Sequence, residues 1–363
     1  MGGRVVTLKD SILCKRILCS AALALLTGGM ILHSAVFSGA NYIPVLDSST
    51  SMSRTDPDGR ISMIDEPADS RQVLTMGFVG NCIVGSMLGS GAYGTFNEQL
   101  EMEGPAYFLK GASSVLAEDD WTVCALGSVL SDGDYRPAEK NDDERAWYLA
   151  PAAGAQVLAE GSIDVVSLAT DHTKDYGAEG SADTKAALEG AGLLWGDDEK
   201  AVYLEKHDIR IGIYPCRLEN METDLPRILG WIGNASASCD LVVIYPHGHM
   251  GMEPDSPEVF AAYCSMIESG ADMVLATHST TLYEPVSYAD GVIVPALGSF
   301  LSGDTRFPEM ETGVFRVKLL CTGGRIESWE WEMIPFLAYE EPWQPILAPS
   351  GNQVNKPDAD GTQ

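Results

Sequence analysis

The chain has 363 residues, and its 23 Lys and Arg against 52 Asp and Glu give a formal net charge of -29. This charge argues against nucleic acid as a partner, because phosphate binding requires a clustered basic surface. Only 21% of the residues are charged and 45% are hydrophobic, so the chain differs from a disordered acidic tail and can bury a large core.

The N-terminus predicts a membrane-inserting segment. Four basic residues lie within residues 1–16, and residues 17–40 contain no Asp, Glu, Lys or Arg. As a helix this stretch would span about 36 Å, enough to cross a bilayer. Because basic residues favour the cytoplasmic side, we expect a single-pass protein of the cell membrane with its bulk extracytoplasmic. Cleavage after the small residues Ser38-Gly39-Ala40 would instead make it a secreted protein.

Composition divides the chain into five parts. Residues 1–16 are a basic cytoplasmic N-terminus, and residues 17–40 are the transmembrane anchor or signal segment. Residues 41–72, rich in Ser, Asp, Pro and Arg, suit a linker. Residues 73–338 alternate short apolar runs with helical stretches and predict one domain of mixed α and β structure, and residues 339–363 predict a polar tail.

Secondary structure within this domain is predicted from apolar runs, helix caps and turn residues. We expect strands at Val73–Val79, Ile163–Leu168, Leu241–Tyr245 and Met273–Ala276, helices at Ser181–Glu189 and Ser256–Ser269, and an antiparallel hairpin of Gly313–Leu320 and Arg325–Ile334. Such a mixture of strands and helices is typical of α/β and α+β folds.

Polar residues follow several of the predicted strands. Asn81, Asp171, His172, His249 and His278 each come shortly after an apolar run. Because strand ends at one edge of a sheet converge on a common crevice, these side chains are candidates for one site. Imidazole and carboxylate ligands together suit Mn, Zn or Fe. The alternative is that each histidine is an isolated polar residue on a loop.

Five ordered segments resemble a known family. They are VVSLATDHTKDYG at residues 165–177, Asp183-Thr184 with Gly190-Ala191-Gly192, HMGME at residues 249–253, GADMV at residues 270–274 ahead of His278, and ALGSF at residues 296–300. These strings are similar to motifs of the CapA proteins of bacterial poly-γ-glutamate capsule synthesis, within the metallophosphoesterase superfamily. The resemblance covers about residues 73–338 and implies a four-layer α/β/β/α sandwich with two mixed sheets.

The resemblance also implies a set of site residues. The implied metal ligands are His172, His249, His278, Asp171 and Asn81. If the chain is active, Asp171, His172 and Glu253 are its implied catalytic residues, with Glu253 orienting a histidine.

Several positions depart from the family pattern. Asn81 stands where the family has a charged ligand, and Gly127 stands where it has a glutamate. Thr277 and Thr280 replace two histidines, whereas Asp171 returns one carboxylate. A two-metal centre needs more ligands than remain, so we expect one divalent metal at most.

Two functions therefore stay open. In the first, the chain serves capsule or cell-envelope polymer synthesis as a binding or scaffold component with a degenerate metal site. In the second, it is an active metal-dependent hydrolase of the metallophosphoesterase type. The implied partners are membrane proteins of capsule synthesis and an anionic polymer, which the acidic surface would repel unless a bound cation intervened.

Overall fold

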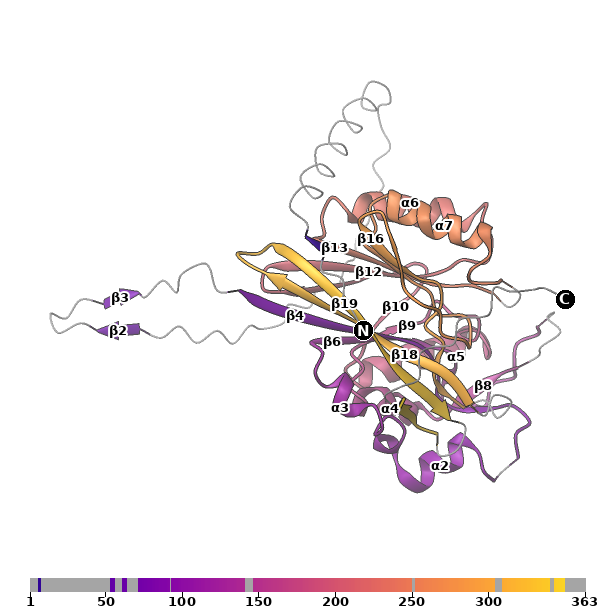
Figure 1. Cartoon of the computed structure of the whole chain (residues 1–363). Helices are drawn as coiled ribbons and strands as arrows, with labels where there is room; N and C mark the ends of the chain where they lie inside the picture. Colours follow the sequence, from indigo (N-terminus) through magenta and orange to yellow (C-terminus); the bar gives the residue numbers. More distant parts are fainter. Residues whose placement is uncertain are drawn as a thin grey trace, which may run out of the picture.

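The computed structural model describes residues 71–349 except residues 92, 141–145, 250–251, 304–308 and 340–342, together with three short strands nearer the N-terminus (Figure 1). The predicted membrane segment, most of the predicted linker and the end of the predicted tail lie outside the described residues. Within the described part, no helix is long and apolar enough to cross a membrane.

Two mixed β-sheets form the centre of the molecule (Figure 1). The first sheet has the order β1-β19-β18-β4-β6-β9-β10, with β17 beside β4 and β20 beside β19. Its strands are β1 (Val6–Thr7), β4 (Gln72–Ile83), β6 (Trp121–Leu126), β9 (Val165–Ser167), β10 (Leu194–Gly196), β17 (Ser299–Ser302), β18 (Glu309–Cys321), β19 (Ile326–Tyr339) and β20 (Pro345–Leu347).

The second sheet has the order β11-β12-β13-β14-β16-β15. Its strands are β11 (Val202–Lys206), β12 (Ile209–Arg217), β13 (Leu241–His247), β14 (Met273–Leu275), β15 (Val286–Tyr288) and β16 (Gly291–Val294). Two small sheets accompany the large ones: β5 (Ser86–Met87), β8 (Tyr148–Ala150) and β7 (Val129–Leu130) form one, and β2 (Ser53–Thr55) and β3 (Ile61–Met63) form the other.

Helices lie on the outer faces of both large sheets (Figure 1). The first sheet is covered by α2 (Phe96–Glu103), α3 (Ser113–Leu116), α4 (Ala155–Glu160) and α5 (Gly177–Gly190), with the short 3-10 helices η1 (Pro105–Tyr107) and η2 (Ala152–Gly154). The second sheet is covered by α6 (Asp224–Ala235) and α7 (Pro257–Glu268). The predicted mixed α and β fold is thereby confirmed.

In the described part of the chain, three hydrophobic cores fill the spaces between these layers. The core between the sheets includes Phe78 of β4 and Val243 of β13. A second core packs β4, β6 and β9 against α2 to α5, and a third packs β13 and β14 against α6 and α7. The central parallel strands are covered on both faces, which explains why they are continuous apolar runs in the sequence. The hydroxyl of Tyr245 donates a hydrogen bond to the carbonyl of Val79 and ties the two sheets together.

Two strands run further than the sequence predicted. The strand predicted to end at Val79 continues to Ile83, so Asn81 lies inside β4 and pairs with Ala125. The reason is a close backbone contact: a Cβ on Gly80 would lie 1.7 Å from the carbonyl oxygen of Gly298. The glycine therefore allows close packing within the sheet and does not begin a turn. The strand predicted to end at Tyr245 likewise continues to His247.

The C-terminal elements extend the predicted domain. The predicted hairpin is confirmed, with longer strands that pair antiparallel from Glu309 to Cys321 and from Ile326 to Tyr339. The predicted polar tail starts at residue 339, yet Trp343 is only 3% exposed and packs edge-on against Phe96 at a centroid distance of 5.9 Å. Strand β20 then pairs with β19, so part of this tail belongs to the folded body.

Candidate functional site

Four side chains come together at the carboxyl ends of parallel strands. Asp171 and His172 follow β9, His247 is the last residue of β13, and His278 lies shortly after β14. We call these four residues the histidine cluster. The two parallel strand sets belong to facing sheets, so the fold brings residues distant in sequence to one place.

Asp171 is the carboxylate of the histidine cluster. Its Oδ1 lies 3.2 Å from Nε2 of His247 and 3.7 Å from Nε2 of His172. Burial alone would raise the pKa of Asp171, but the hydrogen bond and charge from His247, with a smaller effect from His172, hold it well below its ordinary value. The group is therefore an anion at neutral pH.

His247 is a site residue that the sequence reasoning did not select. Its Nδ1 lies 3.0 Å from the hydroxyl of Thr277, and its side chain is buried. His249 and Glu253, which the motif spacing indicates, are both exposed; His249 still lies near enough to His278 to contribute, after burial and His247, to the lowered pKa of His278. The signal that could have identified His247 is the apolar run from Leu241, which leads directly into it and makes it the strand-end residue.

His172 is fixed from the side away from Asp171. Its Nδ1 lies 3.0 Å from Oδ2 of Asp175, and its ring packs edge-on against Tyr148 at a centroid distance of 4.7 Å. In both His172 and His247, therefore, Nδ1 is bound to a supporting residue while Nε2 faces Asp171. This orientation is usual for histidines whose Nε2 binds a ligand.

His278 lies next to His247, with the two rings edge-on and their centroids 6.2 Å apart. Burial, followed by the proximity of His247, lowers the pKa of His278 to about 4, so its imidazole is neutral at pH 7. Its Nδ1 is buried and has no hydrogen-bond partner among the described residues. Gly248 packs against this ring, since a Cβ there would lie 2.9 Å from Nδ1 of His278.

Asn81, near the end of β4, lies next to Gly127, which directly follows β6. Asn81 is 7% exposed, and within the described part of the chain its Oδ1 is buried without a hydrogen-bond partner. A Cβ on Gly127 would lie 3.9 Å from Cγ of Asn81. The two positions at which the sequence analysis noted a missing carboxylate are therefore neighbours in space.

The histidine cluster brings few possible metal donors together. Two imidazole nitrogens lie near one carboxylate oxygen, at Asp171. Across the described residues, however, no three His, Cys, Asp or Glu side chains come together as a group able to hold a metal ion. These residues do not form a ready metal centre in this structure, and the predicted Mn, Zn or Fe ion stays a prediction.

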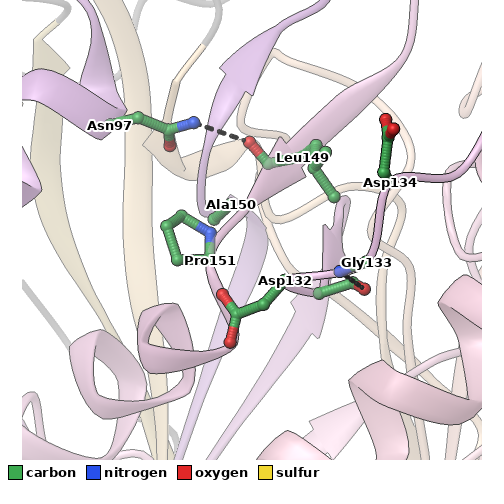
Figure 2. Close-up of a pocket in the computed structure, with 8 residues that line it drawn as sticks. Asn97, Asp132, Gly133, Asp134, Leu149, Ala150 and Pro151 are labelled. Carbon is green, nitrogen blue, oxygen red and sulfur yellow. Dashed lines mark hydrogen bonds between the residues drawn. The ribbon is translucent and has the colours of Figure 1, made fainter.

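A separate pocket of about 410 Å³ lies beside β8 (Figure 2). Its lining consists of Asn97, Ser131, Asp132, Gly133, Asp134, Leu149, Ala150 and Pro151. The side-chain nitrogen of Asn97 donates to the carbonyl of Leu149 at 3.0 Å, as Figure 2 shows. None of the predicted site residues lines this pocket.

Two mixed sheets with carboxylate and imidazole groups at the ends of their parallel strands define an α/β protein whose polar site lies at the strand ends. A family model described as bacterial capsule synthesis protein PGA_cap matches residues 75–304, more than half of the chain. The chain therefore belongs to this family, and the predicted CapA resemblance is confirmed.

A curated relative supports this assignment. The chain is 26% identical over 258 residues to the capsule biosynthesis protein CapA of Bacillus anthracis. The match covers 63% of this chain and 59% of the length of that protein. The similarity thus covers the folded domain of this chain and about three fifths of the relative.

Similar solved structures are more distant. A hypothetical protein from Thermus thermophilus gives a TM-score of 0.43 at 12% identity, covering 72% of this chain and 99% of that one. Vps29 from Chaetomium thermophilum gives a TM-score of 0.27 at 12% identity, covering 72% of this chain and 97% of that one. At these TM-scores the likeness does not establish a common fold.

Proposed function

We propose that this chain is a membrane-anchored, extracytoplasmic CapA-like protein that serves poly-γ-glutamate capsule or cell-envelope polymer synthesis as a binding or scaffold component. The family match over residues 75–304 supports the biological process. The uncharged apolar segment at residues 17–40, with its basic flank, supports the anchor and the orientation. Membrane proteins of capsule synthesis and an anionic polymer are the proposed partners.

The observation that carries the scaffold role is the adjacent pair Asn81 and Gly127. An amide and a missing side chain stand where the related motifs have two acidic residues, and a Cβ on Gly127 would lie within 3.9 Å of Asn81. These two losses are neighbours in space, and Thr280 also stands in place of a histidine. A metal-activated hydrolase of this superfamily depends on the charge and bridging oxygens of such residues.

A polymer assay in cells tests this role. In a polymer-producing cell that depends on this chain, the double variant His172→Ala/His247→Ala should restore cell-bound polymer as well as the wild type does. His207→Ala, in the turn between β11 and β12, is the matched control. Loss of polymer in the double variant alone, with the protein folded and present at the membrane, would contradict a scaffold role.

The orientation of two imidazoles favours a second candidate, a metal-dependent hydrolase of the metallophosphoesterase type. Nε2 of both His172 and His247 points toward Asp171. Their Nδ1 atoms contact Asp175 and Thr277, respectively. Under this alternative a Mn, Zn or Fe ion would polarise a phosphoryl oxygen or a water. Manganese-dependent cleavage of a chromogenic phosphodiester that disappears in Asp171→Ala would make the hydrolase the better account.

A further inference from the structure

A buried ion pair of Lys140 and Asp175 lies next to Nδ1 of His172. Nζ of Lys140 is 2.6 Å from Oδ1 of Asp175, whose side chain is 0% exposed, and the Lys140 side chain is 14% exposed. Burying a charge pair at this depth is costly unless further hydrogen bonds satisfy both groups. The surroundings supply such bonds to Nζ of Lys140 and to Oδ2 of Asp175, whereas Oδ1 of Asp175 has the ion pair alone among the described residues.

Both charged groups are bound at several points. Nζ of Lys140 also donates to the carbonyl of Ala146 at 2.7 Å. Oδ2 of Asp175 accepts from the backbone N–H of Tyr148 at 2.8 Å and lies 3.0 Å from Nδ1 of His172. The carboxylate is thus divided, with one oxygen facing the ammonium and the other facing the imidazole.

This arrangement decides which nitrogen of His172 carries the proton. A carboxylate only accepts hydrogen bonds, so a contact of 3.0 Å between Asp175 and Nδ1 requires a proton on Nδ1. Lys140 lies 3.3 Å from the same nitrogen, but its ammonium is closer to its ion-pair partner Asp175 and donates a hydrogen bond to the carbonyl of Ala146. In the neutral imidazole Nε2 of His172 then carries the free electron pair, and it lies 3.7 Å from Oδ1 of Asp171.

We infer that Lys140 is a positioning residue that acts through Asp175 to hold His172 as the Nδ1–H tautomer, with Nε2 facing Asp171. The ammonium compensates the charge of the buried carboxylate and fixes the position of Oδ1, so that Oδ2 stays in line with Nδ1. Edge-on contact with Tyr148 limits rotation of the ring. Lys140 lies outside the motifs that carry the CapA resemblance, which assign it no role.

This inference concerns the same histidine cluster as the proposed function, but it does not depend on what the cluster binds. The tautomer of His172 can be read in purified, metal-free protein. A failure of the scaffold proposal in cells would leave the tautomer unaffected, and a wrong tautomer assignment would leave the polymer assay unaffected.

The test compares four forms of the full-length chain labelled with ¹⁵N at histidine. Long-range ¹H–¹⁵N spectra are recorded at about pH 8, above the ordinary histidine pKa, with chelator present. His172→Gln identifies the signals of His172. In the wild type, in Lys140→Arg and in the exposed control Lys174→Met, we expect the Nδ1–H tautomer to be the major form.

In Lys140→Met we expect the Nδ1–H form of His172 to be lost as the major form, because the carboxylate is no longer held in line with Nδ1. If this variant does not fold, Lys140→Met/Asp175→Leu replaces the whole ion pair with apolar groups, a change that is often tolerated. The same loss is expected there. An unchanged Nδ1–H signal in a folded Lys140→Met protein, or in the folded double variant, would overturn the inference.

Discussion

Arg316 joins β18 to the segment after α3 through a buried ion pair. Its Nε lies 2.7 Å from Oδ1 of Asp119, and its Nη1 lies 3.0 Å from Glu118. The side chain of Arg316 is 6% exposed and that of Asp119 is 0% exposed. Arg316 also donates to the carbonyl of Val115, so one side chain binds several acceptors, among them the fully buried carboxylate of Asp119.

Removing this cation should destabilise the protein strongly. Arg316→Met leaves Asp119 buried without its partner, which costs about 3 kcal/mol in the free energy of unfolding. Urea denaturation measures this change. Arg325→Met, at an exposed position in the turn before β19, is the control and should change stability by less than about 0.5 kcal/mol. Equal stability of the two variants would show that the Arg316 ion pair is not a structural requirement.

Asp119 also predicts a pH dependence of stability. Burial raises its pKa from 3.8 to about 6, although Arg316 opposes the shift. The folded state therefore binds this proton more tightly than the unfolded state does. The resulting stabilisation is complete below about pH 4 and is lost as the pH rises through about 6, with an upper limit of about 3 kcal/mol.

This dependence is measured against Asp119→Asn, which cannot titrate. The difference in unfolding free energy between wild type and variant should fall between about pH 4 and 6 and stay level above that range. Taking the difference cancels the titration of the other carboxylates, including the neighbours Glu118 and Asp120. A difference that is constant with pH would contradict the raised pKa.

The close packing of β4 against the segment at Gly298 depends on Gly80. A Cβ on Gly80 would lie 1.7 Å from the carbonyl oxygen of Gly298, which also accepts the backbone N–H of Asn81 at 3.1 Å. Since backbone atoms cannot move aside as a flexible side chain does, Gly80→Ala must push the segment at Gly298 away from β4. The variant should lose about 3 kcal/mol of stability and disturb Asn81.

The matched control is Gly190→Ala at the end of α5, where a Cβ would meet nothing within 4 Å. That substitution should be neutral or stabilise by up to about 1 kcal/mol, because alanine restricts the unfolded chain. Thermal unfolding of both variants gives the comparison. A Gly80→Ala protein as stable as Gly190→Ala would contradict the close backbone contact.

The buried strands could be predicted from sequence because they are apolar runs, but their ends could not. Gly80 resembles a turn signal, and only the three-dimensional contact with Gly298 shows that it lies within a strand. Likewise, the motif spacing indicates His249 but not His247, which the strand pairing places at the end of β13. Trp343 belongs to the core through contacts with Phe96, distant in sequence, which composition cannot indicate.

The site was predicted in part. Asp171, His172 and His278 were recognised and lie close to His247 in the structure. The supporting contacts were not predictable, because Lys140 and Thr277 reach the histidines from separate loops and strands. Such contacts depend on how the two sheets face each other, and no local pattern in the sequence records that arrangement.

The chain as a whole is acidic, with a net charge of -29, and belongs to a family of capsule synthesis proteins. An anionic polymer would be repelled by such a surface at long range, and salt would weaken that repulsion. A binding or scaffold role therefore requires local contacts or partner proteins, whereas a hydrolase requires a bound cation. The metal content of the protein separates these two accounts.

The decisive measurement is the metal content of the purified full-length chain at neutral pH, after exposure to Mn and Zn and removal of loosely bound ions. We predict far less than one metal per chain in the wild type, and an increase in Asn81→Asp/Thr280→His, which restores two donors; Asn234→Asp on the exposed face of α6 is the charge control. About one metal per wild-type chain, lost in His247→Ala and retained in His207→Ala, would contradict the degenerate site and favour the hydrolase.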